Sequence, residues 1–190
     1  MEWIGKFRYE PRSHKTISIG QKKIDWKLRG SDEEIREWIQ NQKRPSLQFD
    51  GASKNNPGQA GAGGVIKDHQ GKILVTYEWG LGIMSNNKAE AYSLLLGTSI
   101  LRRLGLQYPL IMGDSAIIIA AMVSRKDFKQ IALNNIKSRI IDNLRDIEDA
   151  TFKHVLRSSN KEADEQANKA VSRRVGQVKE NESSYDRAIP

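Results

Sequence analysis

The sequence predicts an α/β domain in which helices flank a mixed five-stranded sheet, three strands antiparallel and two parallel. Three strand-like segments follow one another between residues 46 and 79 with only short connections, so they should pair antiparallel. Two later strand-like segments, at 110–112 and 151–156, are each reached across helical sequence. Strands connected in this way are expected to run parallel to the first strand.

Residues 1–45 are expected to form a strand-strand-helix extension that ends in a polar linker. Apolar and polar residues alternate over 17–19 and again over 24–28, which predicts a hairpin. Ser31 followed by Glu34 is the pattern of a capping box, so a helix should begin there. A proline at position 45 closes the segment, and the main domain is expected over residues 46–175.

The first half of the main domain is expected to supply the three antiparallel strands. Residues 47–50 are a short strand, and the glycine-rich segment 51–64 is expected to begin as a turn. A second strand begins or continues at 65–66. A third covers 73–79, which is rich in residues that favour strands.

Helical periodicity dominates the second half. The apolar spacing predicts helices at 86–104, about 115–123, about 128–147 and 160–173. The helix at 86–104 is apolar on most of its circumference, as expected for a buried central helix. The tail at 176–190 is polar and is expected to be disordered.

Composition narrows the classes of function. The net charge of +8 favours a polyanionic partner such as nucleic acid. The chain contains no cysteine, which excludes disulfides and thiolate-bound zinc, and its three histidines show no metal-ligand spacing. A metal would therefore have oxygen ligands, which favours Mg²⁺ or Mn²⁺. Without an apolar run of membrane length or a signal-peptide core, we expect an intracellular protein with no membrane contact.

Four carboxylates occupy unusual positions. Asp50 and Asp114 each end a predicted strand, Glu90 lies near the start of the most buried helix, and Asp164 begins the last helix. Strand ends and helix starts can converge in a mixed sheet, and clustered carboxylates repel one another unless divalent cations bind between them. Taken singly, each residue is as readily a turn former or a residue that favours a helix start.

The sequence around these carboxylates resembles a known family. The segments are DGASKNNPG at 50–58 with GAGGVI at 61–66, then SNNKAE at 85–90, GDS at 113–115 and NKEADEQA at 160–167. They resemble, in order, the four motifs of type 1 ribonuclease H. The resemblance covers about residues 46–173. The phrases at 50–53 and 154–157 most resemble the plant and retroelement branch of that family.

The resemblance implies a ribonuclease H-like fold and a metal-dependent endoribonuclease that cuts the RNA strand of RNA–DNA hybrids with two Mg²⁺ or Mn²⁺ ions. In this interpretation Asp50 would bridge the two ions. Asp164 would help to hold the ion that activates the attacking water. Glu90 and Asp114 would help to hold the ion on the leaving-group side.

The resemblance also implies contacts with the substrate. Asn56, Asn86 and Asn87 match positions that contact the RNA strand, including its 2′-hydroxyls, which distinguish RNA from DNA. Ser85 matches a position near a DNA-strand phosphate. Many family members carry a histidine on a longer loop before the last helix. Here that loop is short, and His154 falls within a predicted strand, so Arg157 is the residue expected to reach the phosphate.

Exonucleases of the wider superfamily usually place a glutamate two residues after the first aspartate. This chain has Ala52 at that position, which argues against an exonuclease. The stronger rival is an inactive nucleic-acid-binding or assembly module of a larger ribonucleoprotein or retroelement-type complex. In either interpretation, residues 1–45 could dock a protein or, through aromatic side chains among basic ones, bind nucleic acid.

Overall fold

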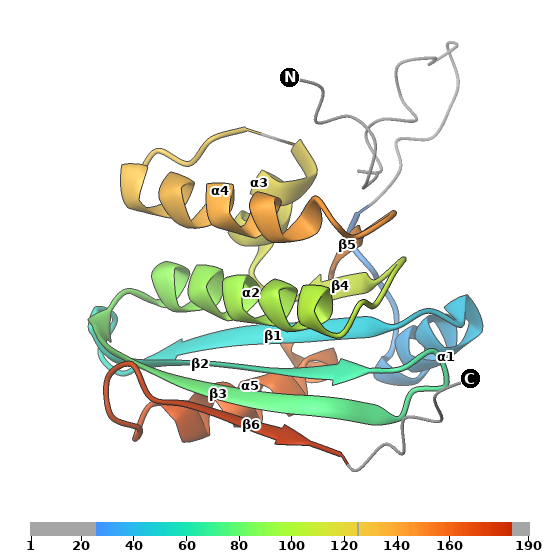
Figure 1. Ribbon diagram of the computed structural model, residues 1–190, viewed down its shortest axis with the longest axis horizontal. Coiled ribbons are helices and arrows are strands. Elements are labelled where there is room, and N and C mark those ends of the chain that lie inside the picture. Colours follow the sequence, from blue (N-terminus) through green and yellow to red (C-terminus); the bar gives the residue numbers. More distant parts are fainter. Residues whose placement is uncertain (1–25, 125, 184–190) are drawn as a thin grey trace.

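The computed structural model describes residues 26–124 and 126–183. It contains one six-stranded sheet with the strand order β5-β4-β1-β2-β3-β6. Helices cover both faces of this sheet, with α2 on one face and α5 on the other (Figure 1). The predicted strand at 17–19 lies outside the described residues.

The five strands expected from the sequence are present with the expected directions. β1 (Ser46–Ser53), β2 (Gly58–Lys67) and β3 (Ile73–Met84) pair antiparallel in succession. β4 (Leu110–Gly113) pairs parallel with β1, and β5 (Thr151–His154) pairs parallel with β4. The predicted fold class is therefore confirmed.

The helices follow the predicted positions with small shifts at their ends. They are α1 (Asp32–Gln42), α2 (Asn86–Arg103), α3 (Ala116–Ser124), α4 (Ile131–Leu144) and α5 (Lys161–Ala170). A single 3₁₀ turn, η2 (Arg157–Ser159), precedes α5. The capping box at the start of α1 is also confirmed, since Ser31 Oγ accepts a hydrogen bond from Glu34 N and the Glu34 carboxylate accepts one from Ser31 N.

The glycine-rich segment departs from the prediction of a turn that begins at residue 51. β1 continues to Ser53 and β2 already begins at Gly58, so only 54–57 form the turn. A Cβ added at Gly63 would lie 2.2 Å from the backbone nitrogen of Ala167 in α5. The glycines of β2 therefore allow a helix backbone to lie directly on the sheet. Glycines with this role in a strand are easily mistaken for turn residues in the sequence.

α2 fills the centre of the main core. Its apolar side chains pack on Leu47 and Phe49 of β1, and α4 covers its outer side (Figure 1). On the opposite face, three alanines of α5 are fully buried against the sheet: Ala163, Ala167 and Ala170. Short side chains on this helix let it approach the sheet as closely as the β2 glycines allow, and this close packing fixes the position of the start of α5.

The prediction of a disordered tail over 176–190 is wrong for its first part. Residues Val178–Glu182 form a sixth strand, β6, antiparallel to β3. Arg103, at the end of α2, forms ion pairs with Glu180 and Glu182. Because β6 is polar and exposed, its strand pairing comes from backbone hydrogen bonds and surface charges, and hydrophobic periodicity gave no signal for it.

None of the helices in the described ranges is long and apolar enough to cross a membrane.

Candidate metal centre

Three of the four predicted carboxylates meet at one point. Asp50, Glu90 and Asp114 each offer an oxygen atom, and these atoms lie within 4.8 Å of one another. The sheet register explains part of this proximity, since β1 and β4 are parallel with Gln48 opposite Met112. Two residues further along each strand, the chain reaches Asp50 and Asp114.

Gly51 brings the third carboxylate to this point. A Cβ added at Gly51 would lie 2.2 Å from the backbone nitrogen of Glu90, so the first turns of α2 rest directly on β1. Ser85 is the N-cap of α2 and its hydroxyl accepts a hydrogen bond from Lys88 N at 3.4 Å. The start of α2 is thus fixed by a cap and by contact with a glycine.

The cluster is electrostatically unfavourable when no cation is bound. Burial, and then the charge of Asp114, raise the pKa of Asp50 to about 7. Burial and the charge of Asp50 raise the pKa of Glu90 well above its ordinary value. Burial is also the main cause of the raised pKa of Asp114. The raised pKa values mean that ionising all three buried carboxyl groups together is energetically unfavourable.

The residues present fit a divalent cation. Glu90 is buried, and its Oε2 atom has no hydrogen-bond partner. A buried carboxylate oxygen without a partner is costly, and a hard cation between the three carboxylates would remove both this cost and the mutual repulsion. Asp50, Glu90 and Asp114 could therefore bind a metal ion.

Asp164 lies outside this group of three. Its Oδ1 accepts hydrogen bonds from Arg157, at 2.7 Å from Nη2 and 3.2 Å from Nε, and its Oδ2 accepts one from Asn168 at 3.1 Å. Its charge nevertheless contributes to the raised pKa of Asp50. Asp164 is therefore a neighbour of the cluster, and its own carboxylate forms an ion pair with Arg157.

Asn160 is a site residue that the sequence reasoning missed. It is fully buried, and its Nδ2 donates to the backbone oxygen of Phe49 at 2.9 Å and reaches Asp114 Oδ1 at 3.5 Å. Its backbone oxygen accepts from Asp164 N at 3.0 Å. An asparagine directly before a helix is expected to be an N-cap, but the side chain of Asn160 makes no capping hydrogen bond. It instead ties Asp114 and the start of α5 to β1.

The residues expected to contact nucleic acid lie at the same end of β1 and α2. Asn56, in the exposed turn between β1 and β2, accepts a hydrogen bond from Asn86 N on its Oδ1 at 2.8 Å. Ser85 and Asn87 flank Asn86 and are half-buried. Arg157 is exposed and is held beside Asp164. The turn between β1 and β2 and the start of α2 therefore form one surface near the three clustered carboxylates.

His154 is a strand residue, as its position in the sequence indicated. It lies in β5, and its Nε2 is 3.1 Å from the backbone oxygen of Asp114. The ring of Trp26 meets the His154 ring edge-on, with 5.9 Å between the ring centroids. His154 therefore contacts the backbone of the loop that carries Asp114.

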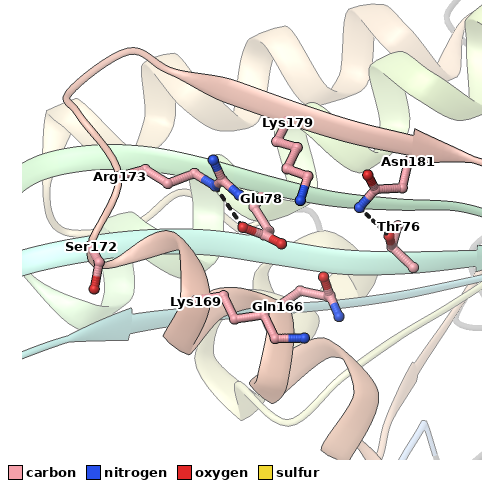
Figure 2. A pocket seen from close by; sticks show the side chains of 8 residues that line it. All are labelled: Thr76, Glu78, Gln166, Lys169, Ser172, Arg173, Lys179 and Asn181. Carbon is pink, nitrogen blue, oxygen red and sulfur yellow. Dashed lines mark hydrogen bonds and ion pairs between the residues drawn. The ribbon is translucent and has the colours of Figure 1, made fainter.

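A polar cavity of about 580 Å³ lies away from this cluster, between α5, β3 and β6 (Figure 2). Its lining includes none of the clustered carboxylates. Its one acidic side chain, Glu78, accepts a hydrogen bond from Arg173 Nε at 2.5 Å, and Lys169 and Lys179 also line the cavity. Because its acid is already paired and the rest of its charge is positive, this cavity does not suit a cation.

Related proteins of known sequence match most of the main domain. A ribonuclease HI of Halobacterium salinarum is 30% identical over 128 residues, which are 67% of this chain and 64% of that protein. A bifunctional protein of Mycobacterium tuberculosis is 28% identical over 127 residues, which are 66% of this chain and 35% of that protein. The chain thus spans less than two thirds of the length of either relative.

Solved structures show the same fold. The RNase H1 of Halobacterium salinarum superposes with a TM-score of 0.64 at 30% identity, over 67% of this chain and 97% of that one. LC11-RNase H1, solved in complex with an RNA/DNA hybrid, gives 0.63 at 27% identity, over 67% and 96% of the two chains. These matches do not single out the plant and retroelement branch, because the named organisms are an archaeon and a bacterium.

The sequence model of the family described as reverse transcriptase-like matches residues 48–170. This span contains all four predicted carboxylates and most of the sheet. The chain therefore belongs to the reverse transcriptase-like family, and its main domain has the ribonuclease H fold.

Proposed function

We propose that this protein is a metal-dependent endoribonuclease that cleaves the RNA strand of RNA–DNA hybrids. The observation that carries the proposal is the convergence of Asp50, Glu90 and Asp114, with an unpartnered oxygen on buried Glu90. A related protein named as ribonuclease HI and a similar structure solved with an RNA/DNA hybrid support the same activity.

Two divalent ions, Mg²⁺ or Mn²⁺, would supply activation of the attacking water and stabilisation of the leaving oxygen. As the resemblance to ribonuclease H implies, Asp50 would help to hold both ions. Glu90 and Asp114 would hold the ion on the leaving-group side, and Asp164 would contribute to the other. Arg157 now holds the Asp164 carboxylate, and in this proposal it would turn to a substrate phosphate when Asp164 takes up its ligand role.

Recognition of the hybrid would come from the surface around Asn56 and the start of α2. Side-chain amides of Asn56, Asn86 and Asn87 can both donate and accept hydrogen bonds, as contacts to a 2′-hydroxyl require. Ser85 and the α2 N-terminus would face a phosphate of the DNA strand. Such contacts read the backbone and sugar, so we expect little dependence on base sequence.

A panel of labelled substrates tests the proposed specificity. The full-length protein is incubated with Mg²⁺ or Mn²⁺ and an RNA–DNA hybrid, single-stranded RNA, duplex RNA or duplex DNA. The proposal expects internal cuts in the RNA of the hybrid only, leaving a 3′-hydroxyl and a 5′-phosphate. Tight binding of the hybrid without any cleavage, with either metal, would instead establish an inactive binding module.

A further inference from the structure

The N-terminal segment 26–42 lies outside the family match, yet it contacts the loop before Asp164 directly and the backbone of Asp114 through His154. Leu28 N donates to His154 O, and His154 N donates to Trp26 O, each at 2.8 Å, so this segment extends the sheet beyond β5. His154 in turn contacts the backbone of Asp114. The segment therefore extends along the β5 edge of the sheet as far as the residues that contact Asp114.

Helix α1 is anchored on the sheet face that also carries α5. Ile35 is buried in a small cluster with Leu110, Met112 and Val155, and Trp38 and Ile39 pack against the same cluster. Burial of this apolar face fixes α1 relative to β4. The first turn of α1, which holds Asp32, is thereby set beside η2.

Asp32 makes two short contacts with η2. Its Oδ1 accepts hydrogen bonds from Ser159 Oγ at 2.7 Å and from Ser158 Oγ at 2.8 Å. These hydrogen bonds lower the pKa of Asp32, so the side chain is an anion at neutral pH. Hydrogen bonds to an ionised acceptor are stronger than those between neutral groups.

The two serines sit between the residues that touch the acids. Arg157, directly before them, holds Asp164, and Asn160, directly after them, reaches Asp114. Gln48 Nε2 donates to Ser159 O at 2.9 Å. Asp32 therefore holds this short loop through the serine hydroxyls, and Gln48 holds it through a backbone oxygen.

We propose that Asp32 is a positioning residue of the active site, which fixes the loop 157–159 so that Asn160 holds Asp114 in place and Arg157 stays beside Asp164. This inference rests on the proposed function for its catalytic consequence. It assigns the N-terminal segment a part in building the metal site. Outer partners that orient metal ligands commonly affect metal affinity or activity by about 10–100-fold.

The test compares Asp32→Ala with Glu33→Ala. Both residues are acidic and lie in the first turn of α1, and Glu33 is exposed. Hybrid cleavage is measured as kcat, KM and the Mg²⁺ concentration that gives half-maximal rate. Asp32→Ala should lower kcat or raise the half-maximal Mg²⁺ concentration by about tenfold, with KM for the hybrid within about twofold. Glu33→Ala should match the wild type in all three.

A double-mutant cycle separates positioning from a general effect on folding. Ser158→Ala combined with Ser159→Ala should reproduce the loss seen in Asp32→Ala, and joining all three changes should add nothing further. Asp32→Asn keeps an oxygen acceptor and should restore part of the activity. Equal, small effects of Asp32→Ala and Glu33→Ala, or losses that simply add, would overturn the proposal.

A readout without catalysis keeps the inference separate from the proposed function. The amide hydrogens of Ser159 and Asn160 are donors within the loop, to Leu156 O and Arg157 O. Their exchange with solvent should be faster in Asp32→Ala than in Glu33→Ala, even if the wild type cleaves no hybrid. Unchanged exchange in Asp32→Ala would refute the positioning role. A wild type that cleaves nothing while the loop still loosens would refute only the proposed function.

Discussion

At the scale of single residues, the main feature of the metal centre is that its clustered carboxylates lower the stability of the metal-free protein. Asp50 and Glu90 are buried within reach of a third acid, and one oxygen of Glu90 has no partner. Such an arrangement destabilises the metal-free protein and becomes favourable only when a cation is bound. The same repulsion that opposes folding therefore provides the affinity for metal.

The raised pKa of Asp50 gives a signed dependence on pH. Its pKa is 3.8 before perturbation and about 7 in the fold, so between these values the folded state holds a proton that the unfolded state has released. The contribution of this proton to stability is complete below about pH 4 and is lost as pH rises through about 7.

Asp50→Asn should therefore raise the melting temperature of the metal-free protein at pH 8 and change it little at pH 4. A change on the order of a few degrees is expected, since roughly 1 kcal/mol corresponds to about 2–4 °C in a domain of this size. Melting curves in a chelating buffer check this. Asp142→Asn, at an exposed site on α4, is the control, and a variant that is less stable at pH 8 would refute the electrostatic account.

Metal addition should also relieve the repulsion between the ionised carboxylates. Mg²⁺ or Mn²⁺ should raise the melting temperature of the wild type at pH 8, with a larger effect than at pH 5, because protons then compete less for the carboxylates. The stabilisation should be greatly reduced in Asp50→Asn and kept in Asp142→Asn. An equal response of all three proteins would mean that the ions bind elsewhere.

At the scale of the elements, glycines in the strands set how closely the helices approach the sheet. Gly51 allows α2 to rest on β1, and Gly63 allows α5 to rest on β2. From its sequence this segment is predicted to begin as a turn, because glycine is common both in turns and where a helix closely approaches a strand. The helices, by contrast, were predicted well because α1, α4 and α5 each bury one face and α2 is apolar on most of its circumference.

Gly51→Ala should separate α2 from β1 and move Glu90 away from Asp50. The added Cβ would lie within 2.2 Å of a backbone atom, which cannot be relieved by a side-chain rotation. We expect a loss of about 1–3 kcal/mol of stability together with loss of the metal response. Gly71→Ala is the comparison: nothing lies within 4 Å of its added Cβ, so only the cost of its positive φ remains and metal binding should persist.

The strand β6 is the element that the sequence did not reveal. It is short and polar, and its partners are the backbone edge of β3 and the side chain of Arg103. Removing residues 177–190 should lower the melting temperature by a few degrees and expose the β3 edge to association. Size-exclusion chromatography and the cleavage assay check this. Complete loss of cleavage by a folded, monomeric truncation would show that β6 contributes to the site.

At the scale of the whole molecule, the family match accounts for five of the six strands, and two further elements flank it in the sequence. The match covers 48–170, whereas α1 lies before it and β6 after it. Asp50, Glu90 and Asp114, which converge in the structure, could be named from the sequence because short motifs place acids at strand ends and helix starts. Asn160 and Asp32 could not, because their roles depend on hydrogen bonds to residues more than forty positions away in the chain.

Cleavage of one labelled RNA–DNA hybrid over a titration of Mg²⁺, by the wild type and by Asp50→Asn, tests the central claim most directly. The account predicts RNA-strand cleavage that depends on the metal and falls by more than roughly 100-fold in the variant, beyond the effect expected for an outer partner. Cleavage that persists in a chelating buffer, or that Asp50→Asn retains in full, would contradict the assignment of the metal centre.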